Sequence, residues 1–261
     1  MTKSDFNKHL TKIFNKEKGL SYSALSNILK SPSHYYRYVT DKEITEAMKK
    51  GQRFHMAILE PEEFKKKYFI IDDSEKIEEI GGKSPRSTKH YKEWKNSVIL
   101  ENEGRELVDK KEVEIYNRMI DKLKCHSVAG SLLFDSEGEN EKPFTYDDSD
   151  FLITGKIDRA TKEYTVDLKK VADASWHKIR WDIERMNYDL QGVIYSKANK
   201  TKKHYLVYID EACNITVILM QEDKLISYSA KYYAALNSFK ECAEQDLWHM
   251  SYDYYQKMII L

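Results

Sequence analysis

The sequence predicts a domain of the α/β or α+β class, in which helices surround a central mixed β-sheet. Helical periodicity dominates the first half of the chain, and short segments rich in β-branched and aromatic residues begin after Gly138. Helical patterns and strands then alternate, with the most hydrophobic strands in this second half. The chain has 261 residues and no visible repeat or low-complexity linker, so we expect one domain over residues 1–261.

The N-terminal part is predicted to be helical. Its first helix is opened by Ser21 or Ser23, and we expect Pro32 to begin a turn into the aromatic residues that follow. Residues 72–90 show no period and contain two glycines and a proline, which predicts an exposed loop. Helices are expected over residues 20–38, 44–59, 91–100 and 110–123.

The second half is predicted to hold the sheet. A polar turn near Ala160 joins two of its strands, and a turn over residues 210–214 joins two others. Strands are expected over residues 144–146, 151–157, 164–171, 204–209 and 215–219, and helices over residues 175–184, 188–200 and 224–245.

Composition excludes several classes of protein. Lys+Arg and Asp+Glu both number 43, so no global field draws the chain to nucleic acid or membrane, and any DNA contact must come from local clusters. The three cysteines lie far apart without a CxxC pair, which argues against a disulfide framework, a zinc ribbon or an iron–sulfur cluster. No apolar run suits a membrane span and no secretory signal is visible, so we expect a soluble cytoplasmic protein.

The segment from Phe151 to Lys170 carries the chemistry. Strand alternation sends Val166 and Leu168 to the core and points Asp167 and Lys169 to the other face. Asp158 closes the preceding strand, and a hairpin would bring it beside Asp167. Two carboxylates that meet suit a hard cation such as Mg²⁺, which would activate water and neutralise charge in phosphodiester hydrolysis. The alternative is an ordinary salt bridge between Asp167 and Lys169 on a strand surface.

Four further residues are candidates for the same site. Gln191 and Tyr195 are four apart on one helical face, although Tyr195 would equally suit the core. His55 follows Gly51 by four residues, and that glycine would allow another backbone or DNA to come close. Glu141 would add a third carboxylate, with Glu139 as a competitor in the same acidic stretch.

Taken in order, these residues resemble the RecB/RecE-type branch of the PD-(D/E)XK nucleases. The segments LSYSALSNILKSPSHYYRY, AMKKGQRFHMAILEPEEF, PRSTKHYKEW and DLKKVADAS are also similar to the RecE-like (exonuclease VIII) family of phage and prophage recombination exonucleases. The resemblance covers residues 20–200. Its motif is Gly51-x-x-x-His55, Glu141, Gly155-x-x-Asp158, Asp167-x-Lys169 and Gln191-x-x-x-Tyr195, with Gly192 where alanine is commoner.

The resemblance implies a PD-(D/E)XK nuclease core with a helical N-terminal part. It implies a metal-dependent 5′→3′ exonuclease that uses Mg²⁺ or Mn²⁺ on double-stranded DNA ends and leaves 3′ single-stranded tails. The resemblance also implies a homo-oligomeric ring, expected to be a tetramer, and a RecT-like annealing protein as partner. The catalytic set would be His55, Glu141, Asp158, Asp167, Lys169, Gln191 and Tyr195, with His55, Glu141, Asp158 and Asp167 as metal ligands.

Contacts to DNA are predicted from local basic residues with neighbouring tryptophans. Two alternatives remain open at this point: a RecB-like or CRISPR-associated nuclease of other polarity, and a catalytically inactive DNA-binding or assembly module. The candidate DNA-binding residues are Lys83, Arg86 and Lys89, and after the catalytic strand Lys178, Arg180 and Arg185 with Trp176 and Trp181.

Overall fold

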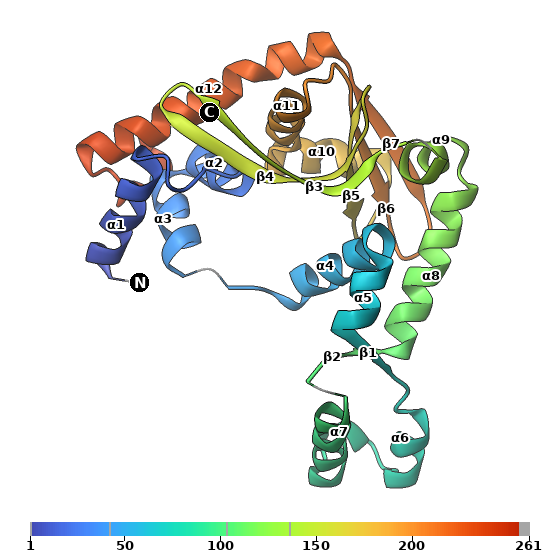
Figure 1. The fold of residues 1–261 in the computed structure, drawn as a ribbon. Coiled ribbons are helices and arrows are strands. Elements are labelled where there is room, and N and C mark those ends of the chain that lie inside the picture. Colours follow the sequence, from blue (N-terminus) through green and yellow to red (C-terminus); the bar gives the residue numbers. More distant parts are fainter. Residues whose placement is uncertain (1, 42, 103, 136, 256–261) are drawn as a thin grey trace.

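A five-stranded mixed sheet forms the centre of the molecule in the computed structural model, which describes residues 2–255 except 42, 103 and 136. The strand order is β3-β4-β5-β6-β7, with β5 and β6 parallel and the other neighbours antiparallel. This confirms the predicted fold class (Figure 1). The strands are β3 (Glu139–Asp148), β4 (Phe151–Ala160), β5 (Thr165–Lys170), β6 (His204–Ile209) and β7 (Ile215–Met220).

Side chains alternate between the two faces of the sheet along each strand. Both faces therefore carry apolar side chains, and helices cover both. On one face Val166, Leu168 and Val207 pack against α4 (Glu46–Leu59), α8 (Lys110–Cys125), α9 (Ser127–Gly130) and a π-helical turn over Ser131–Asp135. On the other face Leu206 and Tyr208 pack against α10 (Trp176–Met186). Burial of each such aliphatic side chain stabilises the fold by about 1.5–3 kcal/mol.

A third cluster joins the N-terminal helices to β4 and to the C-terminal helices. It contains Ile153 and Ile157 of β4 and apolar residues of α1 (Lys3–Phe14), α2 (Tyr22–Lys30), α11 (Tyr188–Asn199) and α12 (Glu222–Gln245). The helix α1 was not predicted. A short 3₁₀ turn, η3 (Tyr252–Tyr254), follows α12.

The expected turn after Pro32 is wrong. Ser31 ends α2, and its hydroxyl also accepts from His34 N as the N-cap of α3 (Pro32–Thr40). Pro32 therefore occupies the first position of a second helix, where its missing N–H costs nothing. The aromatic run is helical, and Tyr35 is buried in the core.

The expected loop over residues 72–90 is only partly correct. It contains the helix α6 (Ser74–Ile80) and the 3₁₀ turn η1 (Pro85–Ser87), with the glycines at the C-terminal end of α6. Figure 1 shows α6 and α7 projecting beyond a second, two-stranded sheet. That sheet pairs β1 and β2 in parallel and was not predicted. The elements are α5 (Pro61–Lys67), β1 (Tyr68–Ile71), α7 (Lys89–Glu101) and β2 (Glu106–Asp109).

The other predicted helices and strands are present within a few residues of their expected ends. The main exception is β3, which runs over ten residues where three were expected. Among the residues that the structure describes, no helix combines the length and apolar character needed to cross a membrane.

Candidate active site

The strands β4 and β5 separate where the candidate carboxylates lie. Their register joins Arg159 to Val166 and Ala160 to Thr165, at the end of β4 and the start of β5. Beyond this point β4 still pairs with β3 but no longer with β5, and the backbone N–H of Leu168 donates to Asp158 Oδ2 at 2.8 Å. The hydrogen bond spans the opening and fixes the orientation of the Asp158 carboxylate.

Three side chains from three elements gather at Asp158. His55 of α4, Glu141 of β3 and Asp158 of β4 each present a ligand atom, and these atoms lie within 4.8 Å of one another. His55 Nδ1 is 3.5 Å from Asp158 Oδ2. This is the cluster of potential metal ligands found in the part of the chain that the structure describes, and it does not include Asp167.

Glu141 reaches the cluster through an unusual backbone conformation. Its φ of 49° lies in the left-handed region, which a residue with a side chain adopts at a cost of about 1 kcal/mol or more. The regular pairing of β3 with β4 is interrupted there, between the pairs Asn140–Arg159 and Lys142–Ile157. Of the two glutamates that competed in the sequence, the structure therefore brings Glu141 to the site.

A chain of polar contacts joins the remaining candidates. Lys169 Nζ lies 2.8 Å from Asp167 Oδ2 and donates to Gln191 Oε1 at 3.1 Å. Gln191 Nε2 lies within hydrogen-bond distance of both Asp167 Oδ1, at 2.7 Å, and the Tyr195 hydroxyl, at 2.8 Å. Asp167 is 1% exposed, so the surface salt bridge considered from the sequence is a buried pair covered by α11.

Burial sets the electrostatics of this site. It raises the pKa of Asp158 to about 6, against the opposing effects of Lys169 and the Leu168 N–H. Burial also raises the pKa of Asp167 to about 6; the Lys169 charge opposes this shift, and the Asp158 charge adds to it. Burial also raises the pKa of Glu141, while burial and the Lys169 ammonium lower that of His55. The site thus concentrates carboxylates whose charge is not fully compensated by the protein.

The donor set fits a divalent cation. Two carboxylates and a neutral imidazole offer oxygen and nitrogen ligands that suit Mg²⁺ or Mn²⁺. Asp167 Oδ2 is buried and lies 2.8 Å from the Lys169 ammonium. No residue that the structure describes donates a hydrogen bond to this oxygen. A buried carboxylate oxygen without a hydrogen bond is costly unless another partner is bound. A cation would be such a partner.

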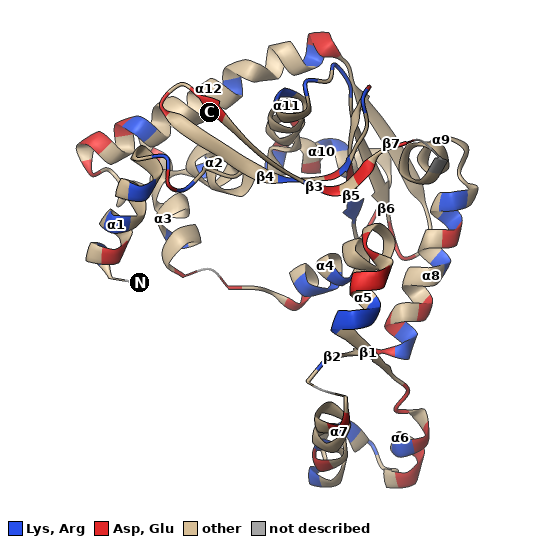
Figure 2. Cartoon of the chain, in the orientation of Figure 1, with Lys and Arg blue, Asp and Glu red and all other residues tan. Residues whose placement is uncertain are grey.

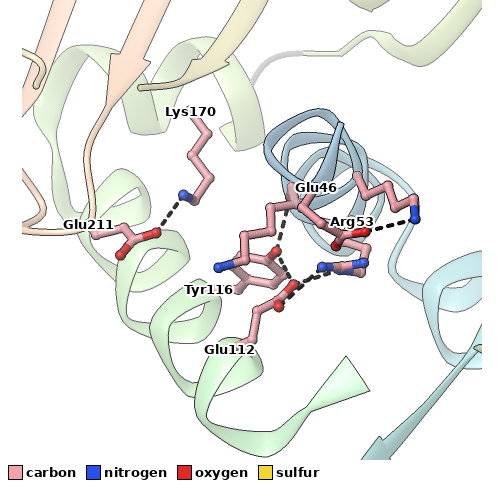
Figure 3. A network of polar contacts seen from close by, with 8 residues as sticks. Glu46, Arg53, Glu112, Tyr116, Lys170 and Glu211 are labelled. Carbon is pink, nitrogen blue, oxygen red and sulfur yellow. Dashed lines mark hydrogen bonds and ion pairs between the residues drawn. The ribbon is translucent and has the colours of Figure 1, made fainter. Parts of the chain in front are cut away.

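The helix that carries His55 is anchored by a network that the sequence did not indicate (Figure 3). Arg53 donates to both carboxylate oxygens of Glu112 on α8, at 2.6 and 3.2 Å. The Tyr116 hydroxyl lies 2.5 Å from Glu112 Oε1 and 3.0 Å from the Lys50 carbonyl. Figure 3 also shows the ion pair between Lys170, next to Lys169, and Glu211. Arg53 and Glu112 thereby hold α4 against α8 two residues before His55.

Packing explains why position 192 holds glycine where alanine is commoner in the motif. A Cβ atom at this position would lie 2.9 Å from the His204 ring and 3.1 Å from Met220 Sδ. The helix α11 therefore packs too closely on β6 for alanine unless these side chains shift. By contrast, no atom of the described protein lies within 4 Å of a Cβ built on Gly51, so the expected close approach of another backbone there is wrong.

The candidate DNA-binding residues are not gathered in one place. Lys83, Arg86 and Lys89 belong to the projection of α6 and α7, and Arg86 is bound to Asp73 and Asp109. Figure 2 shows acidic and basic residues interspersed along most helices, as the zero net charge suggests. Lys178, Arg180, Arg185, Trp176 and Trp181 are exposed on α10, where Arg180 lies over the Trp181 ring.

A solved structure shares this fold. An exonuclease, so named provisionally, from Eubacterium rectale superposes with a TM-score of 0.56 at 14% identity, over 91% of this chain and 86% of the other. A phage-related exonuclease from Haemophilus somnus 129PT matches with a TM-score of 0.38 at 13% identity, over 66% and 92%. No curated protein matches the sequence. The family model described as a PDDEXK-like domain of unknown function (DUF3799) matches residues 21–254, and the chain belongs to that family.

Proposed function

We propose that the protein is a Mg²⁺-dependent exonuclease that degrades double-stranded DNA from its 5′ ends and leaves 3′ single-stranded tails. The observation that carries the proposal is the convergence of His55, Glu141 and Asp158 beside the buried Asp167–Lys169 pair. Membership of a PDDEXK-like family supports a nuclease. The catalytically inactive alternative is disfavoured, because each position of the motif holds a residue able to perform its role.

The chain's own residues would divide the work. His55, Glu141 and Asp158 would hold the cation, with Asp167 as a further ligand through its Oδ2 atom. A bound divalent cation would supply Lewis-acid chemistry, neutralising charge that develops on the scissile phosphate. Mn²⁺ would replace Mg²⁺, because carboxylate ligands suit both ions.

Lys169 would act on the phosphate or on the attacking water. Its side chain is 18% exposed, and its ammonium lies between Asp167, Gln191 and the ring of Tyr188, whose centroid is 4.5 Å away. Burial alone would lower its pKa, but Asp167 leads the neighbours that raise it, so the amine stays charged. A fixed positive charge can stabilise the negative charge of the transition state without reorganising. Gln191 and Tyr195 would orient this pair.

The resemblance to the RecE-like nucleases supports 5′→3′ polarity, a role in recombination by strand annealing, and a RecT-like annealing protein as partner. It also supports a homo-oligomeric ring, a tetramer, around DNA.

The test is digestion of a linear duplex labelled at either its 5′ or its 3′ ends, with Mg²⁺ and with EDTA. We expect early release of the 5′ label as short products, persistence of the 3′ label on long strands, and no reaction in EDTA. Early release of the 3′ label would reverse the polarity, and cleavage in EDTA would contradict the metal requirement.

A further inference from the structure

We propose that a hollow beside the active site, bounded by α2, α3 and the N-terminal part of α4, binds an unpaired DNA strand through Lys30 and Arg37. The hollow has a volume of about 410 Å³ and is open to solvent. The inference deepens the proposed function and rests on it only for the identity of the nucleic acid. None of its residues belongs to the motif of the catalytic site.

Unpaired basic groups line one wall of the hollow. Lys30 ends α2 and Arg37 lies on α3, and both face the hollow together with His34. Neither cation makes an ion pair or side-chain hydrogen bond with any residue that the structure describes, whereas many other surface lysines are paired with carboxylates. Burial and then the charges of Lys30 and Arg37 lower the pKa of His34, so the two cations act on one region. Such a region attracts phosphate.

The same wall offers groups that suit the rest of a nucleotide. Tyr22 and Tyr38 line the hollow, and aromatic rings stack on bases without regard to sequence. Asn27 and Ser23 add polar side chains between them. A volume of about 410 Å³ lies in the range of small-molecule sites and suits one or two unpaired nucleotides.

Two residues of the hollow lie on elements that lead to the catalytic site. The Tyr22 hydroxyl donates to the Met186 carbonyl, and both residues line the hollow. Burial, followed by the neighbouring Tyr188 and Asp167, raises the pKa of Tyr22, which places Tyr22 beside the catalytic pair. Met48 also lines the hollow and precedes His55 by two turns on the same face of α4. A strand in the hollow would thus run toward the catalytic carboxylates.

Two acidic residues also line the hollow. Asp41 and Glu43 precede α4 and line the hollow. Their charges would repel phosphates and so favour a path of the backbone of the strand along α2 and α3. Removal of these charges should therefore have the opposite effect from removal of Lys30 and Arg37.

The experiment measures binding of a fluorescein-labelled single-stranded oligonucleotide of about 15 nucleotides in EDTA, by fluorescence anisotropy over a range of salt concentrations. The variant Lys30→Ala/Arg37→Ala should raise Kd about tenfold and reduce the salt slope by about 1.4, because each lost single-strand phosphate contact accounts for about 0.7. The control Lys8→Ala/Lys12→Ala removes two exposed charges of α1 and should leave both quantities unchanged. Asp41→Asn/Glu43→Gln should tighten binding.

Equal binding by the wild type and the Lys30/Arg37 variant would overturn the proposal, as would an equal loss of affinity in the α1 control. A larger loss on blunt duplex than on single strands would overturn the assignment to an unpaired strand. Hydrolysis of bis(p-nitrophenyl) phosphate separates this proposal from the catalytic one, because so small a diester does not need the hollow. The Lys30/Arg37 variant should retain that hydrolysis, whereas a wild type inactive on both DNA and the small diester would sink the proposed function and leave the binding result to decide the hollow.

Discussion

Gln191 and Asp167 are joined by a hydrogen bond of 2.7 Å that links helix α11 to strand β5 inside the site. The amide nitrogen of Gln191 donates to Asp167, and its oxygen accepts from Lys169 at 3.1 Å. One side chain thus contacts both members of the buried ion pair and leaves Asp167 Oδ2 without a hydrogen bond. This arrangement orients the carboxylate and the ammonium toward the same opening.

Lys169 is expected to act in the transition state. Lys169→Ala should lower kcat by on the order of 10²-fold or more and leave DNA binding largely intact. Lys169→Arg should not restore activity, because a planar guanidinium cannot occupy the compact position of an ammonium. Single-turnover cleavage of a linear duplex at saturating Mg²⁺ measures both variants. Wild-type rates in both would show that the pair with Asp167 is only structural.

The backbone conformation that brings Glu141 to the metal site is expected to lower the free energy of unfolding. Because its φ is 49°, Glu141→Gly should unfold with a free energy about 1 kcal/mol higher than Glu141→Ala, which keeps the strained conformation. Both variants should lose most of the stabilisation that Mg²⁺ gives the wild type in thermal melts. An alanine variant as stable as the glycine variant would contradict the strained backbone.

Arg53 is expected to position His55 through α4. Its ion pair with Glu112 is largely buried, with 12% and 16% of the two side chains exposed, so Arg53→Met should cost about 2 kcal/mol of stability. It should also weaken Mg²⁺ binding about tenfold, because groups that orient metal ligands affect affinity. Lys49→Met, which breaks an exposed pair with Glu46 on the same helix, should cost less than about 0.5 kcal/mol. Unaltered Mg²⁺ binding in Arg53→Met would limit the network to a structural role.

His204 is expected to destabilise the fold in acid. It is fully buried, and burial followed by Lys169 lowers its pKa from 6.5 to about 3. The unfolded chain takes up this proton near pH 6.5, so stability present above that pH is lost as the pH falls toward 3. At pH 5 the loss is on the order of 2 kcal/mol.

Urea unfolding at about pH 7.5 and at about pH 5 tests this expectation. His204→Asn should lose less stability between these conditions than the wild type. His177→Asn, which replaces an exposed histidine, should behave like the wild type. The same pH dependence in all three proteins would rule out His204 as the cause.

Much of the sheet was predictable because its strands alternate or are continuously apolar, as in residues 204–209, which the structure reproduces as β6. The pair β1 and β2 was missed because each strand has four residues and its partner lies far along the chain. The motif located the candidate site, but the left-handed Glu141 and the covering of Asp167 by α11 depend on tertiary packing. The network of Arg53 and Glu112 carries no sequence signal, since its members are 59 residues apart.

Asp158 is expected to be a metal ligand of a nuclease, and cleavage of a linear duplex by wild type and Asp158→Asn as Mg²⁺ is varied measures this role most directly. The substitution keeps the shape of the side chain, and Asp121→Asn on the exposed side of α8 serves as a control. We expect the wild type and the control to cleave only with Mg²⁺, and Asp158→Asn to lose cleavage on the order of 10²-fold or more. Cleavage by Asp158→Asn at the wild-type rate and with the same Mg²⁺ dependence would show that Asp158 does not bind the catalytic metal.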